Sequence, residues 1–104
     1  MMCIITACSS TPSKPDGMLE STYQAGLKTI ETIDDYKDNK ITGNEAYLIM
    51  DDQKHRFKRT AKDSDEGYEV QDAVETLQKI FEHNGRSMEE IDAAYDNIKN
   101  AFGM

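Results

Sequence analysis

Histidine and cysteine are the residues of this 104-residue chain best suited to nucleophilic or metal chemistry, and the chain has two of each. His55 and His83 are far apart in the sequence, and neither has a second His or a Glu at the helical spacing of a known metal motif. No Ser, Thr or Cys stands beside a His in an arrangement that would activate a nucleophile. The pattern therefore predicts no catalytic residue, no metal ligand and no cofactor, and we expect a protein that is not an enzyme.

The acidic segment 34–45 has the length of a calcium-binding loop. Acids occupy its first, fifth and twelfth positions, from Asp34 to Glu45, and Ile41 occupies the eighth, an outline that resembles an EF-hand. The segment departs from that pattern at Tyr36, where an oxygen ligand is required, and at Asn39, where Gly normally permits the sharp turn. We therefore expect a turn between two helices rather than a metal site.

Cys8 is the candidate for covalent modification. It ends the sequence Ile5-Thr6-Ala7-Cys8 and is followed by a stretch rich in Ser and Pro, Ser9-Ser10-Thr11-Pro12-Ser13-Lys14-Pro15-Asp16-Gly17. This pattern resembles the lipobox of small bacterial lipoproteins, in which the thiol receives diacylglycerol and the peptide bond before it is cut. The resemblance implies lipidation of Cys8, attachment to the extracytoplasmic face of a bacterial membrane, and a Ser/Pro tether.

Residues 1–7 are then a truncated signal-like segment. They contain no Lys or Arg, whereas a secretory leader has a basic start followed by roughly 7 to 15 apolar residues. Either the true start lies upstream of Met1, or the match is accidental and the chain has a cytosolic N-terminus with two reduced thiols. Both prolines of the chain fall in residues 8–17, which we expect to be a flexible tether. Residues 18–104 are expected to form one helical domain.

The overall charge excludes one class of partner. Twenty acidic against twelve basic residues give a net charge of −8, which repels the phosphate backbone, so we expect no nucleic-acid partner. No run approaches the roughly 18 apolar residues of a membrane span, so the predicted membrane contact is through lipid.

The acid-rich segments 63–75 and 89–96 could pair as acid and base, although exposed acids on helices are common. The basic segment 54–59 could contact anionic lipid, although a solvated face with Phe57 turned inward is favoured.

Apolar spacing of three to four residues predicts helices throughout residues 18–104. We expect helices over about 18–37, from 43 to about 62, from about 70 to 83, and from 88 to about 102, with a break at 62–67 or one longer bent helix there. Ala25 and Gly26 offer a site of close packing on the first helix. The apolar stripes are Leu19, Tyr23, Leu27, Ile30 and Ile33; Ala46, Ile49, Met50, Gln53, Phe57 and Ala61; Val70, Ala73, Val74, Leu77, Ile80 and Phe81; and Ile91, Ala94, Tyr95, Ile98, Ala101 and Phe102.

Two capping boxes mark helix starts. Thr42 precedes Glu45 by three residues, and Ser87 precedes Glu90 by three residues, so each hydroxyl can accept a hydrogen bond from the later amide while each carboxylate reaches back. Asn84-Gly85 is typical of a helix C-terminus. Short connections between such helices favour antiparallel neighbours. The sequence therefore predicts an all-α fold, a small antiparallel up-down bundle of three to four helices.

Tyr47, Leu48 and Tyr68 fall outside the apolar stripes. They are the candidate residues for binding a protein partner, because Tyr combines apolar area with a hydroxyl at interfaces; packing against the tether or a neighbouring helix is the alternative.

Two functions follow from the sequence. The first is a lipid-anchored, non-enzymatic helical surface module that binds an unknown protein or envelope component. The second is a soluble, cytoplasmic, acidic helical regulator or phage-encoded inhibitor that presents carboxylates to a basic site.

Overall fold

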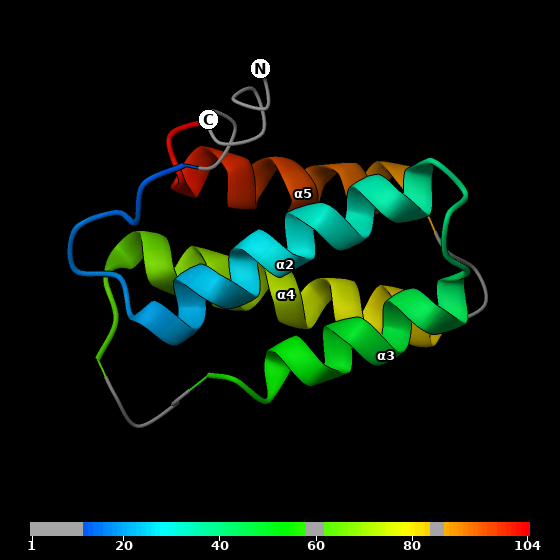
Figure 1. Cartoon of the computed structure of the whole chain (residues 1–104), viewed down its shortest axis with the longest axis horizontal. Coiled ribbons are helices and arrows are strands. Elements are labelled where there is room, and N and C mark those ends of the chain that lie inside the picture. Colours follow the sequence, from blue (N-terminus) through cyan, green and yellow to red (C-terminus); the bar gives the residue numbers. More distant parts are fainter. Residues whose placement is uncertain (1–11, 58–61, 84–86) are drawn as a thin grey trace, which may run out of the picture.

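A computed structural model describes residues 12–57, 62–83 and 87–104. The helices in these residues are α2 (Glu20–Lys37), α3 (Gly43–Lys54), α4 (Asp65–Glu82) and α5 (Met88–Ala101). Consecutive helices run in opposite directions (Figure 1). The predicted all-α, antiparallel up-down bundle is therefore confirmed.

Two of the helices form the centre of the bundle. Both α2 and α4 contact all three other helices, whereas α3 and α5 do not contact each other within the described residues. The central pair, α2 and α4, is thus flanked by α3 on one side and α5 on the other (Figure 1). Because alternate helices of an up-down bundle run in the same direction, α2 and α4 begin at the same end of the molecule.

Close contact between the central helices depends on a small residue in α2. A Cβ atom built on Gly26 would lie 2.4 Å from Cζ of Phe102 and 3.1 Å from Cγ1 of Val70. Ala25, beside it, is completely buried. The predicted close-packing site at Ala25 and Gly26 is therefore confirmed. The largest side chains that are also fully buried come from all four helices, and they are Ile33, Met50, Leu77, Phe81, Ile91 and Ile98.

The turn between α2 and α3 is built from two local motifs. Asn39 has a φ of 62°, its amide donates to the Tyr36 carbonyl at 3.1 Å, and the Lys40 amide donates to the Asp35 carbonyl at 2.9 Å. These two bonds form a Schellman motif, which ends α2. The conformation that a calcium loop assigns to Gly is here adopted by Asn to end a helix.

Thr42 then begins α3 with the predicted capping box. The Thr42 hydroxyl accepts from the Glu45 amide at 3.1 Å, and the Glu45 carboxylate accepts from the Thr42 amide at 2.8 Å. At the start of α5, the Ser87 hydroxyl likewise accepts from the Glu90 amide at 3.3 Å. Both predicted helix starts are therefore at the expected residues. The predicted stop at Asn84-Gly85 lies outside the described residues.

The predicted extension of α3 to about residue 62 is wrong, because the helix ends at Lys54. The amides of Arg56 and Phe57 donate to carbonyls three residues back, at 3.0 and 3.4 Å, so the chain tightens into a 3₁₀-type turn. Phe57 is nevertheless buried, as its place in the stripe predicts. Ala61, the last residue of that stripe, lies outside the described residues.

The predicted break at 62–67 is shorter in the structure, because α4 already begins at Asp65. The Ser64 hydroxyl accepts from the Gly67 amide at 3.0 Å and serves as N-cap. The acids Asp65 and Glu66 then lie in the first turn, where negative charge favours the positive end of the helix dipole. A search for apolar stripes alone misses this polar first turn.

Asp63, in the connection before α4, holds the starts of α2 and α4 together. Its Oδ1 accepts from the backbone amides of Leu19 and Ser64, at 3.0 and 2.8 Å. Its Oδ2 accepts from the Thr22 hydroxyl at 2.7 Å and from Nε2 of Gln71 at 2.9 Å. Leu19 is the N-cap residue of α2 and has no side chain that could cap it. Asp63, which lies 44 residues later in the chain, instead accepts from the backbone amide of Leu19 itself.

The backbone and electrostatics around Asp63 are adapted to this carboxylate. A Cβ atom on Gly67 would lie 2.0 Å from Oδ1 of Asp63, so Gly at this position leaves room for it. Partial burial alone would raise the pKa of Asp63. Hydrogen bonds from Thr22, from the Leu19 and Ser64 amides and from Gln71 outweigh that effect and hold the pKa below the ordinary value of 3.8.

We expect Asp63→Asn to lower the free energy of unfolding by about 2 kcal/mol or more at neutral pH, because hydrogen bonds to a charged acceptor are lost and buried donors are left without it. The wild-type contribution is present above pH 3.8 and is lost as the pH falls through the lowered folded-state pKa. Urea unfolding of both proteins between pH 7 and pH 2 measures this. The difference should shrink in acid, and the exposed control Asp96→Asn should show little change. An Asp63→Asn protein as stable as wild type at pH 7 would contradict this role.

Thr42→Ala is expected to lower the free energy of unfolding by about 1 kcal/mol, because the Glu45 amide loses its acceptor. Thr42→Ser keeps the hydroxyl and should retain most of the stability. Denaturant unfolding followed by circular dichroism checks both variants. Equal stability of the Ala and Ser variants would show that the capping bond does not contribute.

Candidate functional site

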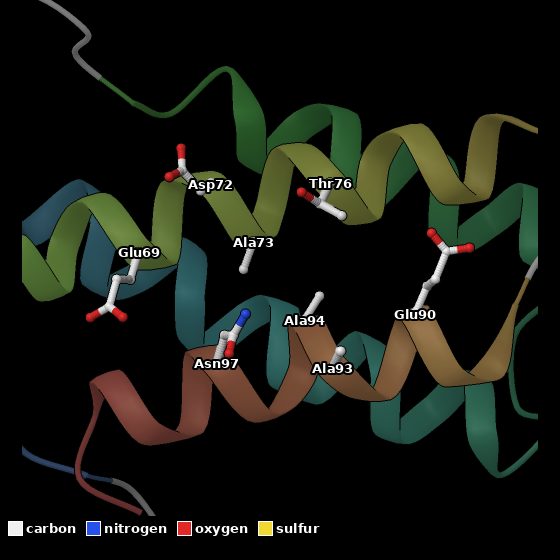
Figure 2. A pocket seen from close by; sticks show the side chains of 8 residues that line it. All are labelled: Glu69, Asp72, Ala73, Thr76, Glu90, Ala93, Ala94 and Asn97. Carbon is white, nitrogen blue, oxygen red and sulfur yellow. The ribbon is translucent and has the colours of Figure 1, made fainter.

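A surface groove lies between α4 and α5. It has a volume of about 380 Å³ and is open to solvent along one side. Figure 2 shows the side chains of both helices that line it: Glu69 and Glu90 point toward the facing helix, whereas the Asp72 carboxylate points away from α5. Its lining consists of Glu69, Asp72, Ala73 and Thr76 from α4 and Glu90, Ala93, Ala94 and Asn97 from α5.

Small residues on both helices create this groove. Ala73 of α4 and Ala94 of α5 are buried and form its floor, with the exposed Ala93 beside them (Figure 2). A methyl group does not fill the space between two helix surfaces, so a channel remains over the contact. The lining residues recur at a spacing of three to four on each helix, which is the spacing of one helix face. This spacing of small and acidic residues is the feature of the sequence from which the groove could have been found. A search for large apolar residues does not detect it.

Carboxylates border the groove on both helices. Glu69 and Asp72 rise from α4 and Glu90 from α5, and all three are exposed (Figure 2). No cation from the described part of the chain forms an ion pair with any of them. The predicted acid-rich segments 63–75 and 89–96 therefore do meet in space. Together they make a groove with a small apolar floor and a negative border.

A second groove, of about 570 Å³, lies between α2 and α5. At one end the Tyr95 hydroxyl donates to Oδ1 of Asp34 at 2.7 Å. Burial, the hydrogen bond to Asp34 and nearby acids raise the pKa of Tyr95 to about 12. Lys37 lies 4.4 Å from the centre of the Tyr95 ring and pairs with Asp92 at 2.5 Å. These contacts join the end of α2 to the middle of α5.

Two acids of the calcium-like segment 34–45 have structural partners. Asp34 accepts the hydroxyl of Tyr95, and Glu45 belongs to the capping box of Thr42. Across residues 12–57, 62–83 and 87–104, no group of three or more His, Cys, Asp or Glu side chains is placed to hold a metal ion. His55 and His83 are exposed C-cap residues of different helices, α3 and α4.

The three predicted partner-binding residues lie on α3 and α4 and differ in exposure. Leu48 is 66% exposed and Tyr68 is 44% exposed, whereas Tyr47 is partly buried against the core. Leu48 lies in the middle of α3, and Tyr68 lies in the first turn of α4. The Tyr68 hydroxyl also accepts from the Asp63 amide at 3.2 Å. Their role in binding a partner stays a prediction.

Cys8 lies outside the described residues, so its lipidation stays a prediction, as does the division of the chain at residues 7 and 17. Within the described part of the chain, no helix is long and apolar enough to span a bilayer. The part of the predicted tether that is described, residues 12–17, lies against the helices. Pro12 and Pro15 are both partly buried there.

Comparison with protein-family models, with curated proteins and with solved structures finds no match for this chain.

Proposed function

We propose that this protein is a non-enzymatic helical binding module that takes a basic segment of a protein or envelope component into the α4–α5 groove. Lipid on Cys8 would hold the module at the extracytoplasmic face of a bacterial membrane. The observation that carries the binding proposal is an alanine floor bordered by carboxylates from two helices, none of which forms an ion pair with a cation among the described residues.

The groove suits the side chains of Lys and Arg. Their aliphatic stems can lie on apolar surface while the charged head stays in water, and here the floor is formed by Ala73 and Ala94. The heads would then meet Glu69, Asp72 or Glu90, with which an Arg can form two parallel hydrogen bonds. The net charge of −8 adds a long-range attraction that speeds encounter with a cationic partner.

The same groove also serves the alternative function, a soluble acidic regulator that occupies a basic site on its target. Both functions use the same carboxylates and differ in location. Membrane attachment through Cys8 therefore separates them, and binding at the groove tests what they share.

We expect the protein to bind hexa-arginine at low salt, and the double variant Asp72→Asn with Glu90→Gln to bind it about tenfold more weakly, since two favourable ion pairs are lost. Fluorescence anisotropy of the labelled peptide measures the dissociation constant, which should rise with salt. The matched control, Asp52→Asn with Asp96→Asn, removes the same charge from exposed positions outside the groove lining. Equal loss in both double variants would show that net charge, and not the groove, governs binding.

A second variant tests the shape of the groove without changing its charge. Ala93 is exposed at the edge of the floor, so Ala93→Phe should fill the channel and weaken hexa-arginine binding while the protein stays folded. Unchanged affinity in this variant would contradict binding within the groove.

We expect the chain, expressed in a bacterium behind a complete leader, to fractionate with membranes, and Cys8→Ala to release it, because one thiol would hold all the lipid. Mass spectrometry of the wild-type protein should show the acyl chains on Cys8. Cys3→Ala serves as the control and should leave the fractionation unchanged. A wild-type chain found only in the soluble fraction would contradict the anchor and favour the soluble alternative.

A further inference from the structure

The segment that leads into α2 is fixed to the domain surface. The Tyr23 hydroxyl donates to the Pro12 carbonyl at 2.5 Å, and the Met18 amide donates to the Pro15 carbonyl at 3.2 Å. Lys14 reaches the Met18 carbonyl with its Nζ at 2.6 Å, and the Met18 side chain is only 2% exposed. The chain is therefore held at Pro12 by Tyr23 of α2.

Very little chain separates this fixed point from the predicted site of lipidation. Four residue steps lead from Cys8 to Pro12, and an extended chain covers at most about 3.3 to 3.6 Å per residue, or about 14 Å in total. Lipid on Cys8 would place that residue at the membrane interface, with its acyl chains among those of the bilayer. Pro12 would then stay within about 14 Å of the headgroups, which is about half the length of an 18-residue helix such as α2.

From this short connection we infer that the α2–α5 groove faces the phospholipid headgroups, so that the domain is held against the bilayer in one orientation. The inference rests on the proposed lipid anchor. Pro12 itself lines this groove, so the short connection brings this surface within reach of the lipid. The full lining is Pro12, Leu27, Ile30, Glu31, Asp34, Asp35, Asp38, Lys40, Tyr95, Lys99 and Met104.

The chemistry of this surface changes along its length. Near Pro12, the lining is formed by the partly buried Leu27 and by Met104, which is 49% exposed. The acids of the lining lie farther along α2, from Glu31 to the C-cap residue Asp38, and Lys40 lines the groove after them. An apolar and exposed Met beside the attachment point suits the headgroup boundary, whereas the acidic end would be repelled by anionic lipid. The end nearest Pro12 is therefore the part of the surface closest to the bilayer.

The opposite face of the bundle is formed by α3, which does not contact α5. Leu48 projects from α3 on the side away from its buried residues Ala46 and Met50, and it is 66% exposed. In the inferred orientation Leu48 points away from the membrane. The α4–α5 groove lies on the other side of α5 from the bilayer contact, and it stays open to a partner.

The orientation can be measured because the chain contains no Trp, so one introduced Trp is a unique reporter. A Cys3→Ser protein is coupled through Cys8 to a maleimide phospholipid in phosphatidylcholine vesicles that contain a nitroxide on the lipid headgroup. We expect Trp fluorescence to be quenched at least about threefold more strongly in Met104→Trp than in the matched control Leu48→Trp, since both positions are exposed.

Two changes test the cause of that difference. Tyr23→Phe removes the hydroxyl that holds Pro12, and a flexible Gly/Ser insertion of about 20 residues before Pro12 lengthens the connection. Each should bring the quenching of the two reporters closer together. Equal quenching of Met104→Trp and Leu48→Trp without these changes, or stronger quenching of Leu48→Trp, would overturn the inferred orientation.

Chemical coupling keeps this test separate from the proposed anchor. Absence of lipid on Cys8 in bacteria would overturn the anchor and, with it, the orientation in the cell. Lipid on Cys8 together with equal quenching of the two reporters would overturn the orientation alone.

Discussion

The arrangement of the bundle depends on one carboxylate shared by two helix starts. Because α2 and α4 run in the same direction, their positive N-terminal ends lie together, and free backbone amides at both need acceptors. Asp63 meets this need by accepting from the Leu19 amide before α2 and from the Ser64 amide before α4. Its lowered pKa shows that the surrounding donors favour the charged form over the cost of partial burial. The relative height of the two central helices is set by this contact.

Helix contacts around the central pair differ in how closely their surfaces approach each other. At Gly26, the absence of a side chain lets α2 approach Phe102 and Val70 without a gap. On the outer side of the α4–α5 contact, Ala73 and Ala94 are also small, and a groove remains open to solvent beside them. Small residues thus permit close packing at Gly26 and leave an open groove beside Ala73 and Ala94. The two contacts also differ in charge, because carboxylates border the α4–α5 groove, whereas Gly26 packs against Phe102 and Val70.

The proposed binding and anchoring surfaces share α5 and use its two sides. One side, toward α4, carries the acidic groove; the other, toward α2, contains Tyr95, Lys99 and the end of the chain. A module held by a short connection at Pro12 would present the first side while the second meets the bilayer. In this arrangement the carboxylates of the α4–α5 groove would face cationic partners rather than lipid.

The sequence by itself determined the helices wherever the signal was local. The capping box at Thr42 and the N-cap hydrogen bond at Ser87 join residues three apart, and apolar residues recur at helical spacing, so these helices can be identified without knowledge of the fold. Even there, the end of α3 at Lys54 was missed, because the pattern of apolar residues continues through Phe57 after the hydrogen bonding has changed.

Tertiary structure alone decided the contacts that join distant parts of the chain. Asp63 reaches Leu19 across 44 residues, and Tyr95 reaches Asp34 across 61. Neither pair has a periodic signal, because the partners become neighbours only when the helices pack. The acidic groove has the same origin: each helix contributes an ordinary row of Ala and acids, and their meeting creates the site. Local hydrogen bonding and periodicity can be recognised in the sequence, whereas complementarity between helix surfaces arises only when the chain folds.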